Sequence, residues 1–158
     1  MPIQFWLFKS EPEAFSYADL EAAPAATTGW DGVRNFQARN FLRDLVAIGD
    51  GVLFYHSRQQ PMAVVGCARV VRAAYPDPSQ FDPGSRYHDP RATQERPIWC
   101  AVDIQATGSL PQPVTLRTLR DSPVAADMWL LRPGARLSIT PVHQSHWHLV
   151  RQLGGRAA

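Results

Sequence analysis

Two strand-like runs separated by only five residues constrain the fold more than any other feature of this chain. Residues 52–57, "VLFYHS", and residues 63–74, "AVVGCARVVRAA", are rich in β-branched and aromatic residues, and the short segment "RQQPM" connects them. Such a pair predicts a hairpin with one long strand. Gly66 lies inside the second run and marks either a β-bulge or the bend of a barrel.

The rest of the chain supplies further short strands that alternate with short helices. Further strands are predicted at residues 3–9, in "IWCAVDIQ" at 98–105 and at the end of "LLRPGARLSITPV" at 130–142. Helices are predicted after the N-cap residues Ser16 and Asn35, in "TLRTLRDSP" at 115–123 and in "HQSHWHLVRQL" at 143–153. About five or six strands with helices between them indicate an α+β fold, a small, strongly curved mixed sheet or barrel decorated with short helices.

The segment "GWDGVRNFQARN", residues 29–40, places the large aromatic side chain of Trp30 beside two glycines. The glycines predict a loop, and the helix that follows carries an apolar stripe of Ala38, Phe41, Leu42 and Leu45. Trp30 therefore lies on a loop with a firm base. Two interpretations stay open: it forms a stacking wall for a planar ligand, or it plugs the open end of the barrel.

The composition fits one globular domain spanning residues 1–158, with residues 153–158 expected to form a poorly ordered tail. The net charge of +2 is too small to demonstrate a polyanionic partner, although Lys9 is the only lysine among 16 basic residues. Arginine suits phosphate binding and base stacking, but its abundance equally fits a GC-rich genome. No run approaches the roughly 18 apolar residues of a membrane span, so we expect a cytoplasmic protein without a membrane partner.

Metal and cofactor chemistry are not expected. Cys67 and Cys100 lie in separate apolar runs, where a thiol behaves as a small hydrophobe. The "HQSHWH" segment puts His143 and His146 on one helical face, with no carboxylate or cysteine nearby to complete a zinc site. We expect a solvated helix face there.

Acid and base side chains are present without a recognisable catalytic spacing. Ser10, Glu11, Asp31, His56 and Ser57 supply suitable groups, but no G-x-S-x-G, H-E-x-x-H or P-loop pattern occurs. An enzyme is therefore the minor hypothesis.

Polar and aromatic groups gather at predicted strand ends and loops. Lys9 and Ser10 follow the first strand, residues 30–35 form the glycine-rich loop, and residues 54–57 end the hairpin strand. If these strands are neighbours, their ends converge on one cleft. Such a cleft offers an unstacked nucleobase an aromatic face, hydrogen bonds at its edge and cations for its phosphate.

Five ordered motifs give this chain a resemblance to a known family. They are "WLFKSEP" at 6–12, "WDGVRNFQARNFL" at 30–42, "GDGVLFYHS" at 49–57, "AYPDPSQFDP" at 74–83 and "LLRPGARLSITPV" at 130–142. Together they closely resemble the EVE domain family of the PUA-like superfamily, which is similar in fold to the YTH domains. The resemblance implies a PUA-like β-barrel and a pocket for a modified base, with modified cytosine in DNA favoured.

The resemblance also implies which residues form the site. The base pocket would comprise Lys9, Ser10, Glu11, Trp30, Asp31, Val33, Arg34, Asn35, Tyr55, His56 and Ser57, and the rim Tyr75, Pro76, Trp129 and Leu131. Phosphate contacts would come from Lys9, Arg34, Arg39 and Arg43. Trp129 departs from the family, in which a smaller residue commonly precedes "LLRPG".

The mechanism that follows is non-catalytic reading of a base that has left the stack and lies against Trp30, with Tyr55 as a second wall. A reader without a fused effector domain acts by occupancy or through a separate effector protein. Two alternatives stay open: a PUA-like module that reads modified RNA, and a small enzyme acting on a nucleoside or metabolite with Glu11 or His56 as the base.

Overall fold

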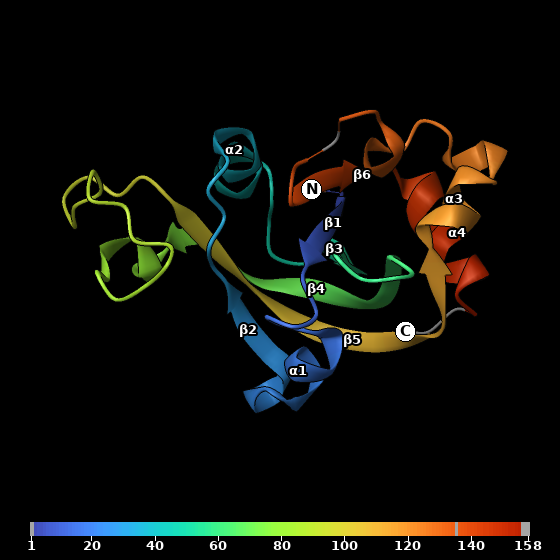
Figure 1. Cartoon of the computed structure of the whole chain (residues 1–158), viewed down its shortest axis with the longest axis horizontal. Helices are drawn as coiled ribbons and strands as arrows, with labels where there is room; N and C mark the ends of the chain where they lie inside the picture. The colour runs from blue at the N-terminus through green and yellow to red at the C-terminus, as the bar shows by residue number, and fades with distance from the viewer. Residues whose placement is uncertain (1, 135, 156–158) are drawn as a thin grey trace.

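A computed structural model describes residues 2–134 and 136–155, and these residues form a six-stranded mixed sheet with four α-helices (Figure 1). The strands are β1 (Phe5–Ser10), β2 (Thr27–Trp30), β3 (Gly51–His56), β4 (Ala63–Pro76), β5 (Cys100–Thr115) and β6 (Ile139–Val142). The helices are α1 (Tyr17–Ala22), α2 (Phe36–Asp44), α3 (Leu116–Arg120) and α4 (Gln144–Leu153). The predicted α+β class and curved mixed sheet are confirmed.

The sheet has the order β2-β5-β4-β3-β1-β6, and the predicted hairpin is its centre. β3 and β4 pair antiparallel, whereas β1 runs parallel to β3, with Lys9 opposite Tyr55 and Ser10 opposite His56. The ends of β1 and β3 therefore lie side by side, which is the condition on which their convergence at one cleft depended.

Gly66 marks a β-bulge. The pairing register of β4 shifts between Val64 and Gly66, and a Cβ atom at Gly66 would overlap the ring of Tyr17. The Tyr17 hydroxyl donates to the carbonyl of Cys67 at 2.7 Å and accepts from the N–H of Gly108 at 3.0 Å. Because Gly66 has no side chain, Tyr17 of α1 packs directly on the bulged strand.

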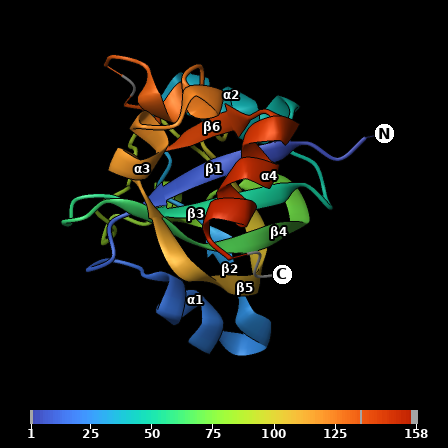
Figure 2. The same cartoon turned by 90° about the vertical axis from the view of Figure 1, so that its right-hand side faces the viewer.

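Each face of the sheet carries its own hydrophobic core, because successive strand residues point to opposite faces. The first core contains Trp6, Phe8 and Phe54, and it is completed by buried residues of α1 and α2. The second contains Leu7 and Tyr55, and it is completed by α3 and α4. Figure 2 shows α1 and α2 at opposite ends of the molecule, as in Figure 1, with α3 and α4 close together.

Helix caps were predicted better than helix ends. Ser16 caps α1 in a capping box with Asp19, and the Asn35 side chain accepts from the N–H of Ala38 at 3.0 Å. The expected burial of Leu45 is wrong: α2 ends at Asp44, and the Leu45 side chain is 49% exposed.

Two strands differ from the sequence expectation. β5 continues to Thr115, well beyond residue 105, because its prolines fall between Ser109 and Val114, where no ladder pairs are formed. Trp30 does not lie on a loop, since it ends the short strand β2 and pairs with Val102 of β5.

The C-terminal helix also corrects two expectations. His146 is buried rather than solvated: its Nε2 lies 3.0 Å from both the carbonyl of Val124 and a carboxylate oxygen of Asp127. Leu153 still belongs to α4 and Gly154 packs on Leu110, so residues 153–155 of the expected tail are part of the packed structure. Residues 156–158 lie outside the described residues. None of the described helices has the length and apolar character needed to traverse a bilayer.

Candidate functional site

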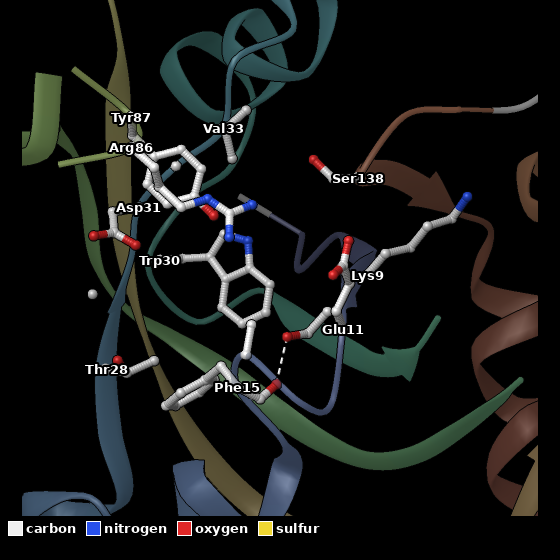
Figure 3. A pocket seen from close by; sticks show the side chains of 14 residues that line it. Lys9, Glu11, Phe15, Thr28, Trp30, Asp31, Val33, Arg86, Tyr87 and Ser138 are labelled. Carbon is white, nitrogen blue, oxygen red and sulfur yellow. Dashed lines mark hydrogen bonds between the residues drawn. The ribbon is translucent and has the colours of Figure 1, made fainter. Parts of the chain in front are cut away.

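The ends of β1 and β2 enclose a cavity of about 470 Å³, which we call the Trp30 pocket (Figure 3). Its lining includes six of the predicted pocket residues: Lys9, Ser10, Glu11, Trp30, Asp31 and Val33. Its other lining residues are Ala14, Phe15, Thr28, Gly29, Gly32, Arg86, Tyr87 and Ser138. A cavity of this size falls within the usual range for small-ligand sites, about 300–1,000 Å³.

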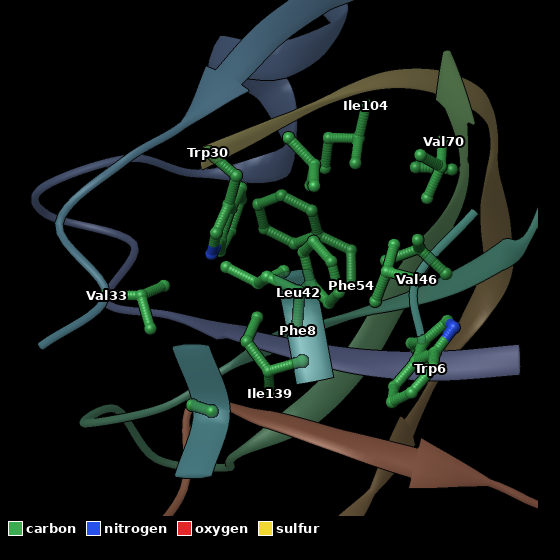
Figure 4. Packing of buried hydrophobic residues seen from close by; sticks show 14 of the residues in the cluster. Trp6, Phe8, Trp30, Val33, Leu42, Val46, Phe54, Val70, Ile104 and Ile139 are labelled. Atoms are coloured by element: carbon green, nitrogen blue, oxygen red, sulfur yellow. The ribbon is translucent and has the colours of Figure 1, made fainter. Parts of the chain in front are cut away.

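Trp30 is both a core residue and a pocket wall. Its ring centroid lies 5.2 Å from that of Phe8 and 5.4 Å from that of Phe54, and only 8% of the residue is exposed. Figure 4 shows its indole nitrogen pointing away from these core side chains. Among the described residues, none accepts a hydrogen bond from this indole N–H, and the residue borders the cavity. Both interpretations of Trp30 therefore apply: its ring packs in the core, and its edge with the indole nitrogen borders the cavity.

The pocket carries charged groups of both signs. Glu11 and Asp31 contribute carboxylates, and Lys9 and Arg86 contribute cations. Burial and the nearby Asp77 charge raise the pKa of Asp31, whereas burial lowers the pKa of Lys9. Carboxylate oxygens accept hydrogen bonds from amino groups, so the pocket can bind a planar ligand that presents an N–H donor.

Arg34 stabilises the pocket wall instead of facing a ligand. Its five N–H donors are all occupied by protein acceptors: two hydrogen bonds to the carbonyl of Tyr87, at 3.0 and 2.7 Å, and one each to Val33, Asp77 and Ser79. The guanidinium is also 5.3 Å from the ring centre of Trp99. The prediction that Arg34 contacts phosphate is corrected, because no donor remains for it.

Asp77 is the buried carboxylate that pairs with the Arg34 guanidinium. Its side chain is fully buried and accepts from Arg34, from the N–H of Gly32 at 2.8 Å and from Ser79. Burial alone raises the pKa of Asp77, but the hydrogen bonds from Ser79, Gly32 and Arg34 outweigh it and hold the pKa below its usual value. The long loop after β4 is therefore held against the segment that follows Trp30.

Gly32 lets the ring of Tyr87 close over this segment. Its φ is +80°, and a Cβ atom there would lie 2.7 Å from the Tyr87 ring. Tyr87 also faces the guanidinium of Arg86, at 4.9 Å from the ring centre. An aromatic ring and an exposed cation from the long loop thus border the cavity beside Trp30.

Several other predicted pocket residues lie elsewhere. Asn35 is used as the cap of α2, and His56 accepts a hydrogen bond from the N–H of Tyr17 at 3.1 Å; neither lines the pocket. Tyr55 points into the second core, on the opposite face of the sheet, because it is offset by one residue from Phe54. The prediction of Tyr55 as a second wall is therefore wrong. Tyr87 is the tyrosine that lines the Trp30 pocket.

The predicted rim residues are also dispersed. Tyr75 donates to a carboxylate oxygen of Asp103, and Trp129 makes an edge contact with Phe41, so each is used in packing. Neither of them, nor Pro76, lines the Trp30 pocket.

Leu131 and Ser57 line a second hollow of about 790 Å³, together with Tyr55 and Lys9. It lies next to the second core, and we call it the Arg120 groove after the residue of α3 that borders it.

The remaining predicted phosphate contacts lie on α2. Arg39 donates to the carbonyl of Ile98 at 3.0 Å, and Arg43 pairs with the neighbouring Asp44 at the surface. Neither borders the Trp30 pocket or the Arg120 groove.

Sequence reasoning missed the contribution of Arg86 and Tyr87. Both residues lie between β4 and β5, beyond the end of the "AYPDPSQFDP" motif, so none of the five motifs contains them. Among the described residues, no group of three His, Cys, Asp or Glu side chains is arranged to hold a metal ion.

The chain has clear relatives among known proteins. Residues 4–153 match the EVE domain. Human thymocyte nuclear protein 1 is 37% identical over 164 residues, which cover 94% of this chain and 72% of that protein. A Pseudomonas putida crystal structure is 41% identical with a TM-score of 0.90, covering 95% of this chain and 99% of that one.

The crystal structure of human THYN1 protein in complex with DNA containing 5-methylcytosine also matches, with a TM-score of 0.90 and 36% identity. The match covers 96% of this chain and 97% of that one. The curved mixed sheet is that of these PUA-like structures, so the fold implied by the resemblance is confirmed. The chain belongs to the EVE domain family.

Proposed function

We propose that this protein is a non-catalytic reader of a modified base in DNA, with 5-methylcytosine as the preferred base. The observation that carries the proposal is the Trp30 pocket, in a chain that superposes along nearly its whole length on a human protein bound to DNA containing 5-methylcytosine. The pocket combines an indole edge, an aromatic loop residue and two carboxylates.

The pocket's polar groups suit the edge of a cytosine. Cytosine presents its N4 amino group as a donor where thymine presents the O4 acceptor, and Glu and Asp side chains accept from that amino group. Glu11 and Asp31 supply carboxylates at the cavity. We therefore assign the choice of cytosine over thymine to these two residues.

The pocket's apolar groups suit a methyl substituent. Phe15, Val33 and Ala14 border the same cavity as the carboxylates. Burying one methyl group contributes about 0.8 kcal/mol, which is roughly a fourfold change in affinity. Base extrusion costs a few kcal/mol, so contacts to the DNA backbone must supply part of the binding free energy.

A catalytic role is disfavoured by the position of the proposed base. His56 accepts from the backbone of Tyr17 and does not line the pocket, so it has no access to a ligand held against Trp30. Glu11 lines the pocket but pairs with Arg58 at 3.2 Å, and no described histidine or cysteine side chain lies beside it in the cavity.

The test uses short DNA duplexes that differ only at one base: 5-methylcytosine, cytosine or thymine. Fluorescence anisotropy at one fixed salt concentration should give the order 5-methylcytosine, then cytosine, then thymine. The Glu11→Gln and Asp31→Asn variants should lose discrimination against thymine, whereas Glu13→Gln, an exposed neighbour outside the pocket, should retain it. Equal binding of all three duplexes by the wild-type protein would refute the proposal, and tighter binding of matched RNA would replace DNA as the polymer.

A further inference from the structure

The charged side chains that line the Arg120 groove, among the described residues, are all cationic. The cationic residues among its lining are Lys9, Arg120, Arg132 and Arg136, and none of its described lining residues carries a carboxylate. Its floor includes apolar side chains of the second core, among them Tyr55 and Leu130. This differs from the Trp30 pocket, in which two carboxylates accompany the two cations.

The guanidinium groups of the groove are available for a ligand. Within the part of the chain that the structure describes, the side chains of Arg120 and Arg136 make no hydrogen bond or ion pair. Arg132 lies over the ring of Trp129 at 4.2 Å, a contact that leaves its N–H donors available. Arg34 shows the opposite pattern, because protein acceptors occupy all five of its donors.

The groove and the Trp30 pocket meet around the end of β1. Phe8 belongs to the first core and Leu7 to the second, so Ser10 follows the face of Phe8 and Lys9 the face of Leu7. Lys9 lines both hollows. Figure 3 shows its ammonium group pointing away from Trp30. One ligand can therefore occupy the pocket and continue past Lys9 into the groove.

We propose that the Arg120 groove binds the backbone phosphates of the DNA strand that flank the base held in the Trp30 pocket. Arginine binds phosphate oxygens bidentately, and three guanidiniums that donate no hydrogen bond to the described residues match a run of such groups. The proposal rests on the proposed function, because it requires a nucleic-acid strand at the pocket. It moves the phosphate contacts from α2 and Arg34, where the sequence suggested them, to α3 and the segment before β6.

The test compares two triple variants with the same change in net charge. The groove variant carries Arg120→Gln, Arg132→Gln and Arg136→Gln. The control variant removes three exposed arginines that line neither hollow, through Arg69→Gln, Arg96→Gln and Arg117→Gln. Unchanged circular dichroism and unchanged urea midpoints establish that both variants are folded.

The measured quantity is the slope of log K against log salt concentration, for duplexes with 5-methylcytosine and with cytosine. Each phosphate contact contributes about 0.7 to 0.9 to this slope, so the groove variant should lose about 2 to 3 from it. The control variant should lose much less. The ratio of the two affinities should stay at its wild-type value in the groove variant, because backbone contacts carry no base information.

Neutral methylphosphonate linkages identify the contacted positions on the DNA. Replacing a phosphate beside the modified base should weaken wild-type binding but have little further effect on the groove variant. An unchanged slope in the groove variant, or an equal loss in the control variant, would overturn the groove assignment while leaving base reading intact. Equal affinities of the wild-type protein for the two duplexes would instead refute the proposed function, whatever the slope.

Discussion

Replacing Arg34 by alanine should destabilise the protein strongly, because it leaves the buried carboxylate of Asp77 without its cation. The Asp77 side chain is fully buried and the Arg34 side chain is 22% exposed. Removing one partner of a buried ion pair costs about 3–5 kcal/mol. The carbonyl of Tyr87 loses both of its hydrogen bonds from Arg34 in the same variant.

Arg34→Lys should give an intermediate result. Lysine keeps the positive charge but has three donors in place of five, so at least two of the observed hydrogen bonds are lost. The expected loss is about 1–3 kcal/mol. In the Arg34→Ala and Asp77→Asn double variant, the combined loss should be smaller than the sum of the two single losses, because the neutral amide no longer needs a cation.

The assay is urea unfolding at neutral pH, followed by tryptophan fluorescence. With an ordinary slope for a small protein, Arg34→Ala should lower the midpoint by roughly 1.5 to 3 M. Arg43→Ala is the matched control, because its partner Asp44 is exposed, and its midpoint should not change detectably. An unchanged midpoint in Arg34→Ala, combined with weaker DNA binding, would refute a structural role and return Arg34 to the phosphate contacts.

Three further predictions concern pH, backbone conformation and thiol reactivity. Burial lowers the pKa of His56 below 6.5, so the unfolded chain binds a proton more readily than the folded protein does. Relative to His56→Gln, the free energy of unfolding should therefore fall as the pH drops below about 6.5, by at most about 1.4 kcal/mol per pH unit. An equal pH profile in the two proteins would contradict this. Gly32→Ala should lower the free energy of unfolding in urea by at least about 1–2 kcal/mol, because the φ of Gly32 is positive. It should also reduce base discrimination, because the added Cβ displaces Tyr87. Wild-type values for both quantities would contradict the close approach of the Tyr87 ring. Burial raises the pKa of Cys67 to about 11, so a thiol reagent at pH 8 should label it only on unfolding, and rapid labelling of the native protein would show that it is accessible.

Local interactions explain what the sequence predicted correctly. Ser16 and Asn35 cap their helices through hydrogen bonds to residues three positions away, and such signals are contained in a short window. The hairpin of β3 and β4 is equally local. The polar residues at the ends of β1 and β3 were expected to converge only if the two strands are neighbours, and Lys9 does lie opposite Tyr55.

Long-range contacts explain what the sequence did not predict. The four residues of β2 form a strand only because β5 pairs with them more than 70 positions later, so Trp30 appeared to lie on a loop. Arg34 looked like a phosphate ligand because the acceptors of four of its five hydrogen bonds belong to a loop over 40 residues away. Tyr55 was misplaced because a difference of one residue along a strand reverses the face on which a side chain lies.

Base reading by this protein is tested most directly by its affinity for one DNA duplex with and without a single 5-methyl group on cytosine. Both affinities are determined at the same salt concentration, because backbone contacts otherwise dominate the comparison. The methylated duplex should bind roughly fourfold tighter or more, as expected for one methyl group buried against the apolar wall of the Trp30 pocket. Equal affinities at every salt concentration would contradict it.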